Sequence, residues 1–224
     1  MPKVKYGSKQ IEYEISVERH LTNTYLQVEQ NQPVLYRTPI EISEDEANKD
    51  VLKKASWVLK KLALVAEPHT EVIRTGSRIP YLGRRYYVEI HQSEKSSVEH
   101  TGAKITIFLN ECDNTEELLY DFYKSKAIEK VKPRFNRWVK LTGLKPSSIK
   151  FIKMEKRWGS CTVNNDIHIN PEVVKLSWSL IDYLIVHELC HIVHKDHSPE
   201  FWKEVEKWLP DYKIKDEKLD LYSF

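Results

Sequence analysis

The chain has 224 residues, of which 41% are hydrophobic, and a formal net charge of +2 at pH 7. This length and apolar content suffice for one large domain or two small ones, and a charge so near zero indicates no class of partner. No stretch approaches the roughly 20 consecutive apolar residues of a membrane span, and the charged segment after Met1 is not typical of a signal peptide. We therefore expect a cytoplasmic protein. Cys112, Cys161 and Cys190 are too few for a disulfide framework or a thiolate zinc site.

The first half of the chain is expected to be rich in β-strands and to hold one helix. Alternating apolar and polar residues, separated by turn residues, predict strands over 4–13, 25–35, 70–90 and 104–109. Ser43 is a candidate N-cap for a helix that runs to about Ala66. Together these elements predict a β-rich N-terminal region over residues 1–112.

The second half is expected to begin with a long helix. Asn114, with Glu117 three residues later, resembles a capping box, and the helix should continue toward Leu141. Pro133 should bend this helix and Gly143 should end it. Residues 149–154 and 167–169 are then expected to pair as a short hairpin around 164–166. We assign residues 113–224 to a second domain, although the two regions could also form one continuous domain.

The most informative sequence in the chain is His187-Glu188-Leu189-Cys190-His191. Residues four apart lie on the same face of an α-helix, so both imidazoles can bind one metal ion while Glu188 lies beside it. This spacing is typical of zinc hydrolases.

The helix that contains this motif is expected to follow the N-cap Ser179 and to run from Leu180 to about His194. It is apolar around most of its circumference, as expected for a helix in a domain centre. Its polar exceptions form one stripe of Tyr183, His187, His191 and His194. A buried polar group without a partner costs on the order of 1 to 3 kcal/mol, and a metal ion would supply that partner. The alternative is that these are ordinary core or helix-end histidines bonded to backbone carbonyls.

Two histidines are candidates for a third metal ligand. His194 is on the polar stripe, but a straight helix places it about one further turn along the axis, away from a metal between the motif histidines. His197 follows the expected helix end, where a turn can bring it back toward the metal. Ser198 and Pro199 are typical of the N-cap and first residue of the next helix, which would fix the position of His197. We therefore prefer His197.

Five motifs follow one another in the second half of the chain. They are Arg157-Trp158-Gly159-Ser160-Cys161, Ile167-His168-Ile169-Asn170, the His187-to-His191 motif, His197-Ser198-Pro199-Glu200-Phe201-Trp202 and Leu209-Pro210-Asp211-Tyr212. In this order they resemble the YgjP-like metallopeptidases, which are related to the SprT-like and WLM zincins. The resemblance covers about the last ninety residues well and the earlier chain loosely, through Ile79-Pro80-Tyr81-Leu82-Gly83-Arg84.

This resemblance implies an α+β fold with a zincin-like catalytic domain of the gluzincin type. It also implies that His187, His191 and His197 are metal ligands and that Glu188 is catalytic. The histidine spacing matches that of the metzincins too, but those proteins carry Gly where this chain has His194 and a Met in a downstream turn. No Met follows Met154.

These residues predict a zinc-dependent metallopeptidase that acts on a peptide or protein substrate. Three neutral imidazoles leave one zinc position for water, and zinc lowers the pKa of that water from about 15.7 toward ~7. Glu188 would take the proton of the water and pass it to the leaving amine. Arg157 or Tyr183 would stabilise the oxyanion or bind the substrate, although a buried ion pair would explain Arg157 equally well. Residues 153–170 are the candidate substrate-binding edge, and Ni²⁺ or another first-row metal would suit the same ligands.

Other polar residues near the motifs have both a functional and a structural interpretation. Asp182 or Asp196 could orient a metal-bound imidazole, but helix capping and surface solvation explain both equally well. His168 alternates with Ile167 and Ile169, so we expect it on the surface.

A different class of function is suggested by the long helix, which carries basic residues among aromatic ones. Lys130, Arg134 and Arg137 belong to this set, and such a face can bind nucleic acid. SprT-like relatives act on DNA-attached proteins, which gives a DNA-associated role by analogy only. Acidic residues dilute the face, however, and most basic helices are simply solvated. A third interpretation is a metal site without turnover, but such a site would not need Glu188. The sequence predicts neither the substrate nor the oligomeric state.

Overall fold

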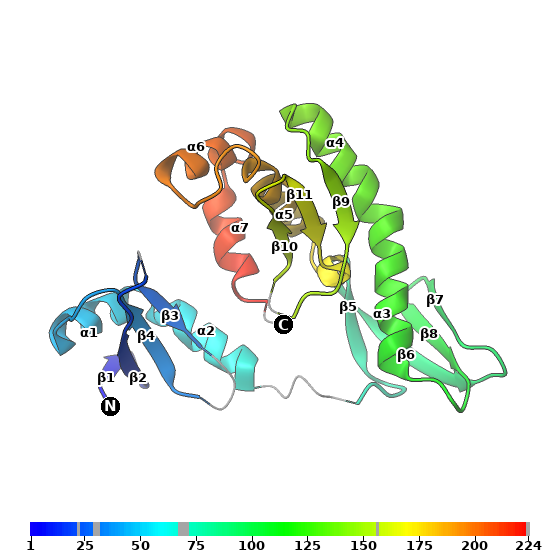
Figure 1. Ribbon diagram of the computed structural model, residues 1–224. Coiled ribbons are helices and arrows are strands. Elements are labelled where there is room, and N and C mark those ends of the chain that lie inside the picture. Colours follow the sequence, from blue (N-terminus) through cyan, green and yellow to red (C-terminus); the bar gives the residue numbers. More distant parts are fainter. Residues whose placement is uncertain (22, 29–31, 67–71, 156, 223–224) are drawn as a thin grey trace. The chain divides into compact units, whose positions relative to one another are not determined.

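The computed structural model describes residues 1–224 except 22, 29–31, 67–71, 156 and 223–224. The architecture is mixed α+β, and the chain divides into two compact units, Met1–Glu71 and Val72–Tyr222 (Figure 1). This division lies well before the boundary that the sequence predicted after residue 112. Within the described residues, no helix combines the length and the apolar character that crossing a membrane requires.

The first unit pairs a mixed sheet with two helices. Its strands, in the spatial order β1-β2-β4-β3, are β1 (Lys3–Tyr6), β2 (Lys9–Val17), β4 (Val34–Thr38) and β3 (Tyr25–Gln27). Strands β2 and β4 run parallel, and the other pairs are antiparallel. The strand expected over 4–13 is therefore a hairpin that turns at Gly7, where φ is +61°.

The helical part of the first unit begins as expected and is then interrupted. Ser43 caps α1 (Glu44–Lys53) through a full capping box with Glu46, which confirms the predicted helix start. The chain breaks at Lys54 and continues as α2 (Ala55–Ala66), so the expected single helix is two helices. Two buried tyrosines connect the sheet to α1, because the hydroxyl of Tyr13 donates to Asn48 (2.8 Å) and that of Tyr36 donates to Asp50 (3.1 Å). This unit therefore has a core of its own.

The second unit begins with a four-stranded sheet and a long helical segment. The strands, in the order β5-β6-β8-β7, are β5 (Arg78–Tyr81), β6 (Arg84–Gln92), β8 (Lys104–Leu109) and β7 (Ser97–Thr101). Strand β8 confirms the prediction for 104–109, whereas 70–90 holds two strands, and its first two residues lie outside the described residues.

A π-helical turn interrupts the long helix just before Pro133, where the sequence predicted a bend. Asn114 caps α3 (Thr115–Lys126) by accepting from the Glu116 N–H, a π-helical turn follows over Ala127–Val131, and α4 covers Lys132–Thr142. Pro133 lies in the first turn of α4, directly after the π-helical turn, because proline cannot donate to the helical hydrogen-bond ladder. Gly143, with φ of +73°, ends α4 as predicted.

A three-stranded sheet and the C-terminal helices complete the second unit. The sheet has the order β10-β11-β9, with β9 (Ser148–Phe151), β10 (Gly159–Cys161) and β11 (Asp166–Ile169). A 3₁₀ helix (Pro171–Lys175) leads to α5 (Trp178–Cys190), α6 (Pro199–Trp208) and α7 (Tyr212–Leu219). The predicted hairpin between 149–154 and 167–169 is wrong, because β9 runs parallel to β11 and the hairpin partner of β11 is β10.

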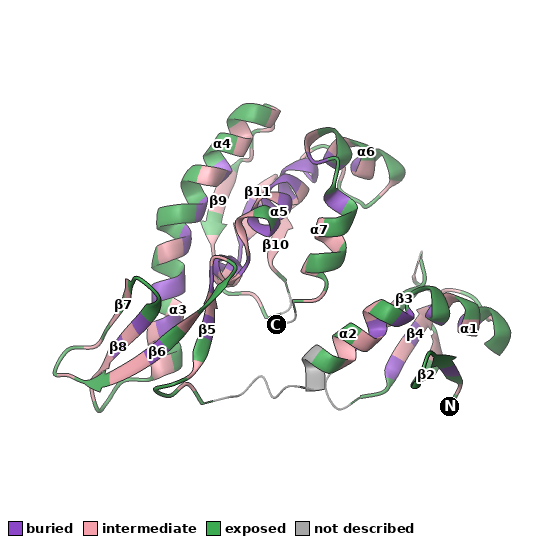
Figure 2. Ribbon diagram, turned by 180° about the vertical axis from the view of Figure 1, so that it is seen from behind, coloured by how far each residue is buried: buried purple, intermediate pink, exposed green. Residues whose placement is uncertain are grey.

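One core joins both sheets of the second unit to α3 and α5. Ile107 of β8, Ile167 of β11 and Ile181 of α5 are each fully buried within it. Helix α5 is buried around most of its circumference, as predicted, and is largely purple in Figure 2. The turn between β5 and β6 reaches the start of α5, where a Cβ on Gly83 would lie 2.7 Å from the Cβ of Ser177. Because β5–β8 share this core with α3, they belong to the second unit, which explains the early division of the chain.

Candidate metal centre

Helix α5 brings two of the motif histidines together with Glu188. The helix begins after the N-cap Ser177 and ends at Cys190, so the predicted N-cap Ser179 and the predicted end near His194 are both wrong. His187 and Glu188 lie in its last turn, and His191 is its C-cap. The chain then turns back, with the His194 N–H donating to the Cys190 carbonyl (3.0 Å).

Three imidazoles converge on one point through their Nε2 atoms. The Nε2 of His187 lies 3.2 Å from that of His191 and 3.1 Å from that of His197. The three ligand atoms all lie within 4.8 Å of one another, which suits a single metal ion. Ser198 and Pro199 form the N-cap and first turn of α6, as predicted, and so hold His197 at its place. His194 is not part of this group, which favours His197 as the third ligand.

The surroundings keep these imidazoles neutral. Burial lowers the pKa of His187 to about 3, and the neighbouring His191 and His197 add to the effect. Burial also lowers the pKa values of His191 and His197. A neutral imidazole has a lone pair to offer a cation, so the group fits a metal ion.

Each imidazole is oriented by a different contact. The Nδ1 of His191 donates to the His194 carbonyl (2.9 Å). His197 stacks on Trp202, with ring centroids 5.5 Å apart and an interplanar angle of 23°. The Nδ1 of His187 lies 3.4 Å from the hydroxyl of Tyr183. All three contacts leave Nε2 directed toward the common point.

Glu188 is buried beside this group without a hydrogen-bond partner for one oxygen. Its side chain is 4% exposed, and its Oε2 contacts no donor in the described part of the chain. Burial raises the pKa of Glu188 to about 8, and the positive charge of Arg157 opposes this rise. An orphaned buried carboxylate is costly, so its position beside the histidines indicates a partner such as water at a metal ion.

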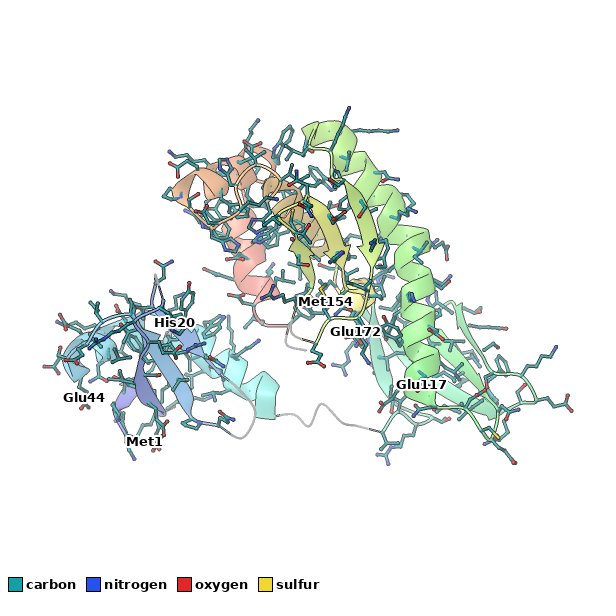
Figure 3. All side chains as sticks on the ribbon, viewed as in Figure 1. Met1, His20, Glu44, Glu117, Met154 and Glu172 are labelled. Atoms are coloured by element: carbon teal, nitrogen blue, oxygen red, sulfur yellow. The ribbon has the colours of Figure 1, made fainter. Side chains whose placement is uncertain are left out.

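The backbone of β10 lies directly against Glu188. A Cβ on Gly159 would be 2.7 Å from the Oε1 of Glu188, so only glycine fits at this contact. The loop that leads into β10 is fixed by Asn170, which is 1% exposed and whose Nδ2 donates to the carbonyls of Met154 (2.8 Å) and Arg157 (3.2 Å). Met154 is labelled in Figure 3, which places it in this loop.

Among the described strands, β10 pairs on one side only, with β11. The N–H of Asn170 donates to Trp158 and that of Thr162 to Asp166, so residues 158 and 162 form hydrogen-bonded pairs with β11. Because such pairs alternate along an antiparallel ladder, Ser160 also faces β11, and the backbone groups of Gly159 and Cys161 face away from it. Strand β10 is thus an edge strand with two outward-facing residues next to Glu188.

The structure separates the two residues that were considered for substrate binding or oxyanion stabilisation. Arg157 is exposed, and no ion pair joins its guanidinium to a carboxylate within the described ranges, so the buried ion pair is wrong for it. Tyr183 is 1% exposed, and its hydroxyl donates to Asp216 (2.6 Å). That hydroxyl lies at the Nδ1 of His187, on the other side of the ring from Nε2, which does not favour an oxyanion role.

The aspartates that were considered as imidazole partners have structural contacts instead. Asp182 accepts two hydrogen bonds from Arg134 (both 2.5 Å) and one from the indole of Trp138 (2.7 Å), which anchors α4 to α5. Asp196 accepts from the N–H of Ser198 (3.4 Å) at the start of α6. His168 faces away from the fully buried Ile167 and Ile169, as predicted, and is partly exposed.

For three residues near the centre, the sequence predicted no individual role. Asp216 lies on α7, and nothing in its local sequence points to the histidines. Gly159 could have been recognised, because a glycine inside a strand often marks a close approach by another group. Lys195 donates to the Oδ1 of Asn165 (2.5 Å) and the carbonyl of Thr162 (2.8 Å), and so fastens the loop before His197 to the β10–β11 turn.

Comparison with known proteins finds one matching family model and several similar solved structures. The family model described as YgjP-like, metallopeptidase domain, matches residues 22–222. The chain is also similar to two crystal structures of metallopeptidase zymogens. One is abylysin of Pyrococcus abyssi, with 22% identity over 40% of this chain and 90% of that chain and a TM-score of 0.37. The other is jannalysin of Methanocaldococcus jannaschii, with 22% identity, coverages of 41% and 93% and a TM-score of 0.36. At these scores neither structure supports an argument about the site, and the curated proteins give no match.

Proposed function

Because the chain belongs to the YgjP-like metallopeptidase family, we propose that it hydrolyses peptide bonds with a zinc ion bound by His187, His191 and His197. The observation that supports this most is the convergence of three Nε2 atoms beside the buried carboxylate of Glu188. The proposal includes a zincin-like catalytic domain of the gluzincin type, with α5 as its active-site helix. Three neutral imidazoles suit zinc, and Ni²⁺ or another first-row metal would also bind them.

Glu188 is the proposed general base. The bound metal would supply Lewis-acid chemistry, lowering the pKa of water and polarising the scissile carbonyl. Glu188 takes a proton from the attacking water as the water oxygen adds to the carbonyl carbon. It returns that proton to the amine nitrogen as the C–N bond breaks. A carboxyl group with a pKa raised to about 8 by burial holds a proton readily near neutral pH, and this pKa would move down beside a bound cation.

The substrate would bind as an additional strand on β10. The outward-facing N–H and C=O groups of Gly159 and Cys161 can pair with an extended peptide, which places its backbone next to Glu188. The substrate-binding edge that was expected over residues 153–170 is therefore reduced to the backbone groups of Gly159 and Cys161. Arg157, exposed and close enough to affect the charge of Glu188, is the proposed contact for a substrate carbonyl, carboxylate or oxyanion.

Glu188→Gln tests the chemistry. Zinc-loaded protein is compared with this variant on a peptide library. Because Glu188 is not a ligand, the variant should keep its zinc and its fold and lose a proton transfer that typically contributes roughly 10²- to 10⁴-fold. Equal cleavage by both proteins would overturn the role of Glu188.

A matched pair of histidine variants tests the ligands. His197→Ala should lose most of its zinc, measured by elemental analysis. His194→Ala should keep it, because the side chain of His194 is not among the converging ligand atoms. Full zinc content in His197→Ala together with loss in His194→Ala would contradict the ligand set.

No feature of the residues that the structure describes favours nucleic-acid binding as a second function. On the long helix, Lys126 and Lys130 both contact Glu129 (2.7 Å each), and Arg134 binds Asp182. These contacts neutralise part of the basic face on which that alternative depends. A protein that cleaves no peptide but binds DNA with a steep salt dependence would restore it.

A further inference from the structure

We propose that helix α7 helps to position the ligands of the metal centre. Asp216 of this helix is a positioning residue that acts through Tyr183 on His187. This inference rests on the proposed function, because it assumes that His187 binds a metal ion. It concerns residues that contact the imidazole rings away from their Nε2 atoms and do not touch the metal or the substrate.

The first observation is a chain of hydrogen bonds from α7 to α5. Tyr183 and His187 are one turn apart on α5, and α7 packs against this helix. The Tyr183 hydroxyl lies 2.6 Å from the Oδ1 of Asp216 and 3.4 Å from the Nδ1 of His187. The side chain of Asp216 is therefore connected to the imidazole through one buried hydroxyl.

The chemistry of these groups determines which atom donates in each of the two hydrogen bonds. A carboxylate only accepts hydrogen bonds, so the hydroxyl of Tyr183 donates its single proton to Asp216. The oxygen of Tyr183 is then left as an acceptor, and the Nδ1 of His187 has to be the donor. With the proton on Nδ1, the lone pair is on Nε2, the atom that faces His191 and His197. Asp216 thus selects the tautomer that can bind a metal.

Of the three ligands, His187 depends most on a side-chain hydrogen bond, the one between its Nδ1 and the hydroxyl of Tyr183. Its remaining ring contacts include Phe201 (centroids 5.0 Å apart) and Trp202 (6.1 Å), neither of which offers a partner for Nδ1. His191 is held by a backbone carbonyl, which no substitution removes. Metal ligands whose second nitrogen loses its partner commonly lose metal affinity by 10- to 100-fold.

The second observation is that the same face of α7 also supports His197. Tyr212 lies four residues before Asp216, so both side chains share one face of the helix. The Tyr212 ring stacks on Trp202 (5.3 Å, 16°), which in turn stacks on His197 (5.5 Å, 23°). One helix face thus orients two of the three ligands, one by hydrogen bonds and one by aromatic stacking.

The experiment measures zinc affinity of the full chain by competition with a chromogenic chelator. Asp216→Ala and Tyr183→Phe should each weaken zinc binding about 10- to 100-fold. Asp216→Asn should stay close to the unaltered protein, because its amide oxygen still accepts from Tyr183. The matched control is Glu217→Ala, which removes an exposed carboxylate at the next position of α7 and should change nothing.

A double variant and a spectroscopic readout separate positioning from a general loss of stability. Because the two residues act in series, Tyr183→Phe with Asp216→Ala should lose no more affinity than Tyr183→Phe alone. The visible absorption of the Co²⁺-loaded protein should change in Tyr183→Phe. In Asp216→Asn it should match that of the unaltered protein. If Asp216→Ala does not fold, Tyr183→Phe and Asp216→Asn still decide the question.

The outcomes distinguish this inference from the proposed function. If the unaltered protein binds zinc through all three histidines, but Tyr183→Phe and Asp216→Ala bind it as tightly, the inference is overturned and the metal site stands. Additive losses in the double variant, or an Asp216→Asn that is as weak as Asp216→Ala, also overturn it. If the unaltered protein binds no metal, the proposed function itself fails.

Discussion

Gly159→Ala is the most informative small change that the structure offers. The added Cβ would lie 2.7 Å from Oε1, 2.8 Å from Cγ and 2.9 Å from Cδ of Glu188, well inside the ordinary contact distance of about 3.5–4 Å. Glu188 is 4% exposed, so its side chain is enclosed by protein. Either the carboxylate or strand β10 has to move. Inserting a methyl group into such a packed site typically costs about 1–3 kcal/mol.

The same displacement should reduce catalysis more than metal binding. A misplacement of about 1 Å can lower a rate by roughly 10²-fold, and Glu188 is the proposed general base. We therefore expect Gly159→Ala to keep its zinc, to unfold at lower denaturant concentration, and to cleave peptide about 10²-fold more slowly in kcat/KM. Zinc content, chemical denaturation and peptide cleavage are measured on the same preparation.

Ser160→Ala is the matched control for this variant. Its side chain points to the opposite face of β10, where its hydroxyl contacts the Met154 sulfur at 3.9 Å, so stability and turnover should stay near those of the unaltered protein. A Gly159→Ala protein with unaltered stability and turnover would refute the reasoning, because it would show that Glu188 is not held against β10.

Three further predictions concern stability. Asp182→Ala should lower the free energy of unfolding by about 1–3 kcal/mol, because the side chains of Arg134 and Trp138 lose the acceptor of their three hydrogen bonds, and it should leave zinc affinity unchanged; weaker zinc binding would give Asp182 a role at the imidazoles. In metal-free protein, the raised pKa of Glu188 means that the folded state keeps a proton that the unfolded state releases. The free energy of unfolding should therefore fall as the pH rises from about 4.5 to 8. Glu188→Gln should remove this fall, which is measured by denaturation at a series of pH values. Ser43→Ala should destabilise the first unit by about 1 kcal/mol in thermal unfolding without changing zinc content, and an unchanged melting curve would contradict the capping box.

Features with a local cause could be predicted from the sequence. Ser43 starts α1, Gly143 ends α4 and Ser198 precedes α6, because capping depends on a few neighbouring residues. Strand β8 alternates strictly and was predicted with its observed limits. The start of α5 was missed by two residues, since both Ser177 and Ser179 are acceptable N-caps and packing at the β5–β6 turn favours the first.

Features that depend on tertiary pairing could not be predicted. Strand β10 is the short sequence Gly-Ser-Cys, which has little intrinsic preference for a strand and forms one by pairing with β11. The parallel pairing of β9 with β11 requires a crossover that no local pattern reveals. The division of the chain after residue 71 likewise follows from which elements share a core, not from where strands give way to helices.

The candidate site shows the same distinction between local and tertiary information. His187 and His191 belong to one helical turn, so their spacing alone places both imidazoles on one face. The third ligand needs the turn that precedes Ser198, which the sequence also signals. The residues that orient these ligands come from α7 and from the stack on Trp202, and only packing brings them together. A motif of this kind therefore predicts where a metal ion binds, whereas its affinity depends on residues far away in the sequence, such as Asp216.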